Sequence, residues 1–294
     1  MDDKLYIITG CTAVGKTEYA INFAMKNNAE IISCDSLLVY KHMNIGTAKP
    51  TPVEMRGIRH HCIDLVEPSE KFDVSMFIRA ARMGIDSIIS SGKNVVVVGG
   101  SGFYLKSFYY PIIDDIKVPQ ETDDFVNSIY AKSGLDGLIA TLVAANDGIC
   151  PSIDIKNSRR VISALKRCLA SGKTFDNVRS DFVSLDSPFK QYQKYTIFLE
   201  RDPEDLKRRV WERTKKMLDM GLINEVKFLL SKYVRLNDSA ENAIGYRETI
   251  NWLQSDMTQD ALIKEIAQNT LKLVKKQKTW FKKQIPIDKK IVLR

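Results

Sequence analysis

The sequence predicts an α/β protein in which a parallel sheet is flanked by helices and interrupted by a small all-helical insertion. Three observations predict this fold class. Residues 4–9 form a short apolar run that leads into a glycine-rich segment and then a helical pattern, which is the order of strand, loop and helix. Residues 94–98 form a continuous apolar run, typical of a parallel strand buried on both faces. Residues 115–194, in contrast, show helical patterns and loops but no good strand.

The glycine-rich segment spans 10–17 and reads Gly-Cys-Thr-Ala-Val-Gly-Lys-Thr, which matches G-x-x-x-x-G-K-[ST]. Its position between a strand and a helix is the context that a phosphate-binding loop (P-loop) requires. Backbone N–H groups and the helix N-terminus attract phosphate oxygens there, Lys16 adds a full positive charge, and the Thr17 hydroxyl can hold Mg²⁺. We therefore expect a P-loop NTPase-like core with Mg²⁺ as cofactor. The residues expected to bind a diphosphate or triphosphate are Gly10, Thr12, Ala13, Val14, Gly15, Lys16 and Thr17.

The remaining elements continue the α/β pattern. Asp202 followed by Pro203 is a good helix start, because Asp caps helices and Pro fits the first helical position. Further strands are expected over 29–34 and 195–200, and helices over 18–26, 74–90, 103–110, 157–171, 203–221 and 258–283. Residues 1–114 and 195–294 then form the core, and residues 115–194 form the insertion.

Three loops that are distant in sequence are expected to meet. In a parallel sheet the loops after the strands emerge at one edge, where ligands bind. This edge joins the P-loop, Asp35 with Ser36 after the second strand, and 99–102 after the third. Arg213, on the helix after 195–200, could reach the same edge. The sequence therefore predicts a site with one phosphate cradle, one carboxylate, one hydroxyl and one guanidinium.

Each side chain of this site has more than one interpretation. Asp35 caps a helix, binds Mg²⁺ through water or acts as a general base. Ser101 either turns the chain between glycines or binds an oxygen of the leaving group. Arg213 is either an ordinary surface arginine or a bidentate clamp on a diphosphate. Spacing alone leaves these alternatives open, because structural and catalytic charges look alike in sequence.

Composition restricts the class of protein. The 294 residues carry a net charge of +8 with a pI of about 9.1, which favours a polyanionic partner such as nucleic acid. No apolar run approaches the length of a membrane span, and residues 1–4 lack the basic region of a signal peptide. The five cysteines include no C-x-x-C pair, which argues against a zinc ribbon or a disulfide framework and favours a reducing cytoplasm. His60 and His61 are expected to have structural or hydrogen-bonding roles.

The P-loop and its neighbours also fit two other functions. In a small-molecule kinase, an aspartate after the second strand activates a substrate hydroxyl. Against this function, Gly99 and Gly100 end the third strand without an acidic residue to hold Mg²⁺, and no arginine-rich lid lies between flanking glycines. The other alternative is a nucleotide-dependent RNA-binding switch, but no segment of the sequence identifies its switch loops.

An ordered series of short blocks spans nearly the whole chain. The first is the P-loop, and the second joins 35–40 to 45–50, which reads Ile-Gly-Thr-Ala-Lys-Pro. The others are His60-His61 with Ile63-Asp64, Gly99-Gly100-Ser101-Gly102, Arg159-Arg160, Glu212-Arg213 with Met217-Leu218, Ala243-Ile244-Gly245-Tyr246-Arg247, and Gln277 with Thr279-Trp280. In this order the blocks resemble the tRNA dimethylallyltransferase family, also called tRNA isopentenyltransferase, in its bacterial form.

The resemblance implies a core whose helical insertion grips the anticodon arm of tRNA. It implies transfer of a dimethylallyl group from dimethylallyl diphosphate to N6 of adenosine 37, next to the anticodon, with release of diphosphate. The P-loop then holds the prenyl diphosphate rather than ATP, and the enzyme is a cytoplasmic, Mg²⁺-dependent monomer with no membrane partner. The implied catalytic residues are Asp35, Ser101 and Arg213, with Arg213 also on the diphosphate. The implied tRNA-binding residues are Asp35, Ser36, Leu37, Leu38, Ser101, Arg159, Arg160, Val161, Ile162 and Ser163.

The chain departs from the family pattern at several of these places. The family's P-loop more often has Pro and Ser where this chain has Cys11 and Val14. Ser101 stands where the family usually has Thr, so a weaker hydroxyl contact is expected. Ser163 stands where Arg is common, and Val126 lies near a position where the family often has another Arg. The details of tRNA contact at these two positions are therefore expected to differ.

Overall fold

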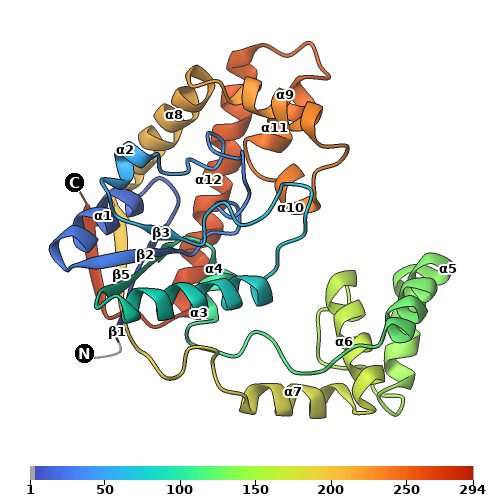
Figure 1. Ribbon diagram of the computed structural model, residues 1–294. Helices are drawn as coiled ribbons and strands as arrows, with labels where there is room; N and C mark the ends of the chain where they lie inside the picture. The colour runs from blue at the N-terminus through green and yellow to red at the C-terminus, as the bar shows by residue number, and fades with distance from the viewer. Residues whose placement is uncertain (1–3, 294) are drawn as a thin grey trace. The chain divides into compact units, whose positions relative to one another are not determined.

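The computed structural model describes residues 4–293 and contains a six-stranded sheet in the order β3-β2-β4-β1-β5-β6 (Figure 1). Every neighbouring pair of strands is parallel. The four strands expected from the sequence are β1, β2, β4 and β5, and the predicted parallel α/β fold is confirmed. The strands are β1 (Lys4–Gly10), β2 (Ala29–Ser33), β3 (His60–His61), β4 (Asn94–Gly99), β5 (Gln193–Arg201) and β6 (Lys289–Leu293).

The order of the strands brings the P-loop and two other loops to one edge of the sheet. β4 lies between β1 and β2, with Thr9 opposite Gly99 and Ser33 opposite Val98. The Thr9 hydroxyl donates a hydrogen bond of 2.8 Å to the Gly99 carbonyl oxygen. A Cβ atom at Gly99 would lie 1.9 Å from the Cys34 carbonyl oxygen, so only glycine allows β2 and β4 to end this close together. The carboxyl ends of β1, β2 and β4 are therefore adjacent.

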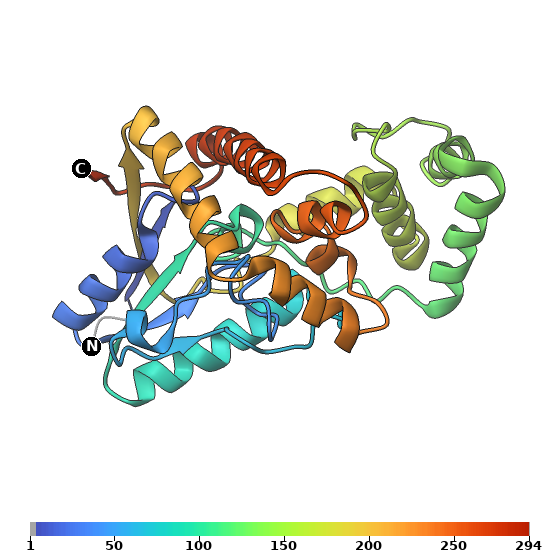
Figure 2. The same cartoon turned by 90° about the horizontal axis from the view of Figure 1, so that it is seen from above.

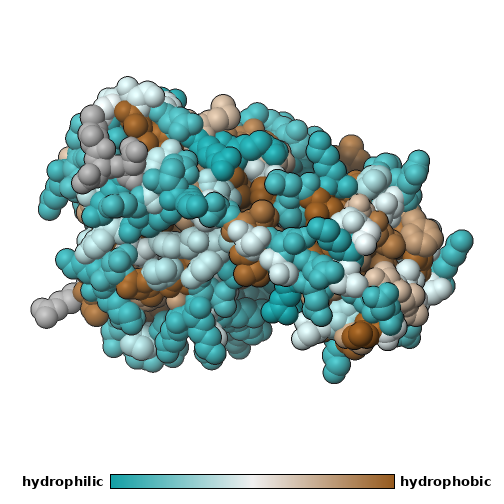
Figure 3. Space-filling view, turned by 90° about the horizontal axis from the view of Figure 1, so that it is seen from below, coloured by the Kyte–Doolittle hydropathy of each residue, from teal (hydrophilic) through white to brown (hydrophobic). Residues whose placement is uncertain are grey.

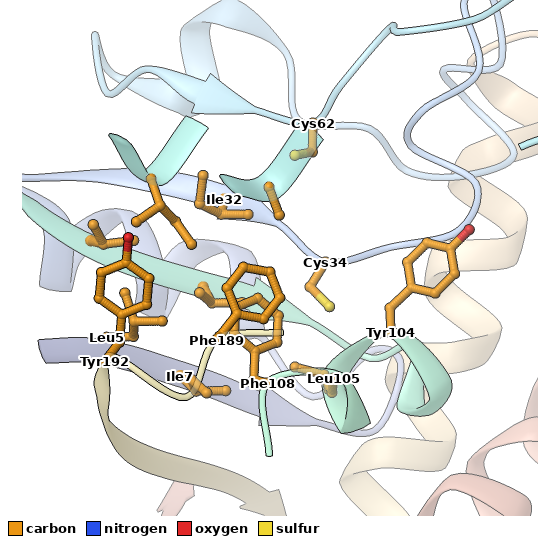
Figure 4. Packing of buried hydrophobic residues seen from close by; sticks show 14 of the residues in the cluster. Leu5, Ile7, Ile32, Cys34, Cys62, Tyr104, Leu105, Phe108, Phe189 and Tyr192 are labelled. Carbon is orange, nitrogen blue, oxygen red and sulfur yellow. The ribbon is translucent and has the colours of Figure 1, made fainter. Parts of the chain in front are cut away.

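Helices cover both faces of the sheet. On one face, α3 and α4 pack on the strands around a cluster that includes Ile32 and Phe77, part of which is drawn in Figure 4. On the other face, α1 and α8 pack around a second cluster. α12 contributes Val274 to the second cluster and Phe281 to the first, and it lies beside α8 (Figures 1 and 2). The helices named so far are α1 (Lys16–Lys26), α3 (Val74–Ser90), α4 (Gly102–Lys106), α8 (Pro203–Asp219) and α12 (Gln259–Gln284).

The long connection after β2 is packed rather than loose. Tyr40 and Met43 are fully buried with Tyr246 in a third apolar cluster. Lys49 is also buried, and its Nζ donates to the Tyr40 carbonyl oxygen at 2.7 Å and pairs with Asp64 at 2.5 Å. This packing fixes the connection against three further helices: α9 (Leu222–Lys232), α10 (Asp238–Glu241) and α11 (Tyr246–Trp252). The connection itself contains the short helix α2 (Pro52–Met55).

The chain divides into two compact units, Met1–Tyr109 with Pro188–Arg294, and Tyr110–Ser187. The regular structure of the second unit, all of which is described, consists of helices alone, and the unit has a core of its own, with Val126, Leu142 and Leu165 among its buried side chains. It begins and ends a few residues before the boundaries expected from the sequence, 115 and 194. Its end lies earlier because Phe189 and Tyr192 pack in the core of the first unit. Its helices are α5 (Gln120–Ala144), α6 (Ser158–Ser171) and α7 (Phe175–Ser184).

The face drawn in Figure 3 is mainly hydrophilic, with hydrophobic residues in small separate groups. Across residues 4–293, none of the helices combines the length and the apolar character that crossing a membrane requires.

Candidate active site

The P-loop has a backbone conformation that requires glycine at two positions. Gly10 has a φ of 155°, and an added Cβ would lie 2.6 Å from the Leu199 carbonyl oxygen on β5. Gly15 has a φ of 106° at the N-cap of α1. α1 then begins at Lys16, so the unpaired N–H groups of its first turn lie next to the loop. The loop is therefore a positive concavity at a helix N-terminus, which favours the binding of a phosphate group.

A cavity of about 540 Å³, here called the first cavity, lies where the three loops meet. Lys16 of the P-loop, Asp35 after β2, Ser101 after β4 and Arg213 on α8 all line it. The structure thus brings together the cradle, carboxylate, hydroxyl and guanidinium that the sequence places at this edge. Much of the remaining wall is apolar, with side chains from Met217, Ile244, Ile266, Leu273, Trp280 and Phe281.

A second cavity of about 580 Å³ shares Lys16 and Arg213 with the first cavity. It is lined by the P-loop residues Ala13, Gly15 and Thr17. Lys16 and Arg213 therefore belong to a cavity that contains the P-loop and to one that contains the carboxylate and the hydroxyl. This arrangement suits an elongated ligand whose anionic end binds the P-loop and whose other end enters the first cavity.

Asp35, Lys16 and Arg213 influence one another's charge. Burial raises the pKa of Asp35, while the hydrogen bond from Leu37 and the charges of Lys16 and Arg213 oppose this shift. Burial lowers the pKa of Lys16 to about 8, with Asp35 opposing the shift and Arg213 adding to it. Burial also lowers the pKa of Arg213, again against the effect of Asp35. Two cations thus face one carboxylate, and an anionic ligand would balance the excess positive charge.

The local structure around Asp35 excludes one of its interpretations, the helix cap. The next helix in the chain, α2, begins at Pro52, so Asp35 does not cap a helix. Its Oδ1 instead accepts a hydrogen bond of 2.9 Å from the Leu37 N–H. The carboxylate therefore stabilises a turn and lines the first cavity at the same time.

Ser101 joins the loop after β2 to the loop after β4. Its Oγ accepts a hydrogen bond of 3.0 Å from the Ser36 N–H and lies 3.4 Å from Ser36 Oγ. Ser101 occupies the N-cap position of α4 but makes no side-chain capping bond there. Its hydroxyl hydrogen can therefore be donated to Ser36 Oγ or to a ligand in the first cavity.

Two arginines that sequence reasoning did not single out support the P-loop. Arg209 Nε donates to the Ala13 carbonyl oxygen at 3.0 Å. Arg201 Nε donates to the Val14 carbonyl oxygen at 3.2 Å. Arg209 lies one turn before Arg213, whose Nη1 donates to Thr12 Oγ1 at 3.3 Å. The spacing of Arg209 and Arg213 on one face of the helix after β5 is the signal that could have identified Arg209.

Glu225 on α9 is a further residue that the sequence did not reveal. Its carboxylate accepts hydrogen bonds of 2.8–3.2 Å from the N–H groups of Asn44, Ile45 and Gly46, and one of 2.6 Å from the Tyr246 hydroxyl. A Cβ at Gly46 would lie 2.4 Å from the Tyr246 ring, so the segment packs closely on α11. Glu225 therefore holds in place a segment whose Gly46 lines the first cavity.

The predicted tRNA-binding residues of the first unit lie around Asp35 and Ser101. Ser36 and Leu37 line the first cavity, whereas Leu38 is half-buried and is not among its lining residues. Four of these five positions, Asp35, Ser36, Leu37 and Ser101, therefore line the first cavity, and Ser36 is hydrogen-bonded to Ser101.

The predicted tRNA-binding residues of the second unit lie on α6. Arg159 and Arg160 are exposed, and Ile162 is half-buried. Val161 is fully buried in the core of the unit, so its side chain does not face solvent. Ser163, where the family often has Arg, is hydrogen-bonded to Arg167 one turn later. Val126 is also buried in this core, so neither departure from the family pattern presents a positive charge.

The residues near the P-loop fit a Mg²⁺ ion that binds together with a phosphate. Mg²⁺ in proteins usually takes one or two protein ligands plus substrate phosphate oxygens and water. Thr17 lines the second cavity and offers such a hydroxyl ligand. Within residues 4–293, no group of three or more His, Cys, Asp or Glu side chains could hold a metal ion by itself. The ligands besides Thr17 would therefore come mainly from the bound phosphate.

Comparison with known proteins assigns the family. The model of the family described as IPP transferase matches residues 38–284 of this chain. The chain belongs to the IPP transferase family. Among its relatives, a tRNA dimethylallyltransferase of Opitutus terrae is 41% identical over 288 residues, which cover 98% of this chain and 92% of that protein. The tRNA dimethylallyltransferase of Bacillus subtilis is 36% identical over 286 residues, which cover 96% of this chain and 88% of that protein.

Solved structures of IPP transferases have the same fold. The full-length tRNA isopentenylpyrophosphate transferase of Bacillus halodurans matches with a TM-score of 0.70 and 30% identity, over 99% of this chain and 90% of that one. A eukaryotic dimethylallyltransferase acting on tRNA matches with a TM-score of 0.83 and 26% identity, over 98% of this chain and 73% of that one. The likeness thus extends over the helical unit as well as the sheet.

Proposed function

We propose that this protein transfers the dimethylallyl group of dimethylallyl diphosphate to N6 of adenosine 37 in tRNA and releases diphosphate. One observation carries the proposal: a P-loop lysine, a half-buried carboxylate and a hydroxyl line the same cavity. A diphosphate and a nucleobase can therefore occupy adjoining places. Membership of the IPP transferase family and similarity to proteins named tRNA dimethylallyltransferase support this assignment.

The P-loop, Lys16 and Arg213 stabilise the departing diphosphate. When the bond between the allylic carbon and the diphosphate oxygen breaks, negative charge develops on that oxygen. Lys16 and Arg213 line the P-loop cavity together with Gly15 at the start of α1, and charged groups in such a cavity act more strongly than they would in water. The Thr17 hydroxyl would hold Mg²⁺ beside the bound phosphate, and the ion would supply further positive charge to the leaving group.

Asp35 accepts the proton of the attacking amine. The N6 amine of adenine is a poor nucleophile because its lone pair is delocalised into the ring. Burial raises the pKa of Asp35, which makes its carboxylate a stronger base than a surface aspartate. In this step the N6–carbon bond forms, the carbon–oxygen bond to diphosphate breaks, and one N6 proton moves to Asp35. The adenine must leave its stack in the anticodon loop to reach the cavity.

The test is to incubate the purified protein with labelled dimethylallyl diphosphate, Mg²⁺ and unmodified tRNA that contains an A-A-A run. We expect the label in the RNA, and mass analysis of its nucleosides should show one adenosine that is heavier by a dimethylallyl group. A tRNA with guanosine at position 37 is the control. Labelling of free AMP but not tRNA would favour a cytokinin-forming activity. Transfer of phosphate from ATP to a small metabolite would favour the kinase.

Replacing Arg159 and Arg160 by alanine is expected to weaken tRNA binding and to reduce its salt dependence. Both side chains are exposed on α6, and each phosphate contact that is lost lowers the slope of log K against log salt by about 0.7–0.9. The measurement is tRNA affinity over a range of salt concentrations. Arg179→Ala, an exposed arginine on α7 of the same unit, is the control. An unchanged salt slope in the double variant would exclude tRNA contact at these two arginines.

A further inference from the structure

Gln277 on α12 makes one hydrogen bond to each of two loops of the active site. Its Oε1 accepts a bond of 2.8 Å from the Thr12 N–H in the P-loop. Its Nε2 donates a bond of 3.0 Å to the Gly100 carbonyl oxygen in the loop after β4. These loops carry the diphosphate cradle and Ser101, and Gln277 itself lines the first cavity. One side chain therefore connects the two halves of the site.

The amide is the chemical group that this position requires. Thr12 N–H can only donate and Gly100 C=O can only accept, so one side chain must offer an acceptor and a donor in a planar pair. Methionine has nearly the same length but offers neither strong bond. Glutamate offers an acceptor to Thr12 but no donor to Gly100 when it is ionised.

α12 holds Gln277 rigidly against both loops. One turn earlier, the buried Val274 packs in the second core cluster, and its carbonyl oxygen accepts a weak bond of 3.8 Å from Cys11 Sγ. One turn later, Trp280 covers Gly102, where a Cβ atom would lie 2.7 Å from the indole ring. The helix therefore follows the P-loop and the loop after β4 over two turns, and Gln277 lies between these apolar contacts.

Polar contacts continue from Gln277 in both directions. On one side, Thr12 also accepts from Arg213, the proposed diphosphate clamp. On the other side, Gly100 precedes Ser101, whose Oγ accepts from Ser36 next to Asp35. Displacement of either loop would change the distance between the leaving diphosphate and the group that receives the amine proton.

We propose that Gln277 is a positioning residue that fixes the diphosphate cradle relative to the Asp35 and Ser101 loops. The proposal rests on the proposed transfer reaction, because the distance it controls is the one between the allylic carbon and N6. A misplacement of about 1 Å between reacting groups can cost about 10²-fold in rate even when both substrates still bind. Gln277 therefore acts on the rate of the chemical step more than on the affinity for either substrate.

The test compares Gln277→Met with the wild-type protein in single-turnover transfer to tRNA. We expect the rate of transfer to fall by roughly 10²-fold. The dissociation constants of dimethylallyl diphosphate and tRNA should stay within about twofold of the wild-type values. Gln277→Glu should also be slow, because Gly100 loses its donor. Gln268→Met, an exposed glutamine on the same helix, is the matched control and should transfer at the wild-type rate.

Hydrogen exchange gives a second readout that does not depend on transfer. Peptides covering 10–17 and 99–102 should exchange faster in Gln277→Met than in the wild type or in Gln268→Met, with the thermal unfolding temperature unchanged. The positioning role alone would be overturned if Gln277→Met had the wild-type rate and the wild-type exchange. It would also be overturned if the rate of Gln277→Met fell only in proportion to weaker substrate binding or lower stability. A wild-type protein that transfers no dimethylallyl group would overturn the proposed function and the positioning role together.

Discussion

Replacing Asp35 by asparagine is expected to lower kcat by roughly 10²–10⁴-fold while tRNA binding stays largely intact. Asparagine keeps the shape of the side chain and can still accept the hydrogen bond from Leu37 N–H, so the turn after β2 should persist. What it loses is the ability to take a proton from the N6 amine. Steady-state transfer to tRNA and a separate binding measurement would distinguish these two effects.

The pH dependence of the same variant provides a sharper test. Asp35 must be ionised to accept the proton, so kcat/KM of the wild-type protein should rise with pH as this carboxyl deprotonates. Because burial raises the pKa of Asp35, kcat/KM should rise at a higher pH than that at which a surface aspartate titrates. Asp35→Asn should lack this limb, and Asp256→Asn, at an exposed position, should keep both the rate and the limb. A nearly normal rate in Asp35→Asn would remove Asp35 from the role of base.

The inner strands of this fold could be predicted because they carry their own signal. β4 contains four consecutive valines, since both of its faces are buried. The edge strands carry no such signal: β3 consists of His60 and His61, and β6 begins with two exposed lysines. His61 is held instead by a hydrogen bond of 2.7 Å from its Nε2 to Glu30 on β2. The hydrogen-bonding role expected of the histidines is confirmed, but the strand they form depends on a partner elsewhere in the chain.

The residues of the candidate site likewise include some that a local sequence pattern predicts and others that it does not. Lys16 and Ser101 lie in glycine-rich segments, and Asp35 directly follows a strand, so local patterns place all three at one edge of the sheet. Glu225 belongs to no such pattern, and Gln277 belongs only to a block that resembles the family and that assigns it no role. Each acts through contacts with a loop that is far away in the sequence. Those contacts exist only after α9 and α12 have packed, and a hydrophobic pattern reports which face of a helix is buried but not which loop it meets.

Replacing Lys16 by alanine is expected to slow transfer by roughly 10²–10³-fold, because the leaving diphosphate loses a preorganised charged donor. Lys16 lines both cavities, so its ammonium group can reach a phosphate bound at the P-loop. Affinity for inorganic diphosphate should fall as well, and Arg213→Ala should change both quantities in the same direction. Lys26→Ala, at the exposed end of α1, is the matched control. Normal binding and transfer in both the Lys16 and the Arg213 variants would mean that the cradle lies elsewhere.

The pKa of Lys16 makes this prediction specific. Burial lowers that pKa to about 8, so the free enzyme loses this positive charge as pH rises through that value. Since kcat/KM reports the ionisation of the free enzyme, kcat/KM for dimethylallyl diphosphate should fall on the alkaline side of about pH 8. Lys16→Arg keeps its charge throughout this range and should lose the alkaline limb, although its altered geometry lowers the rate. If the limb persists in Lys16→Arg, another group is responsible for it, and the charge of Lys16 does not control binding of the diphosphate.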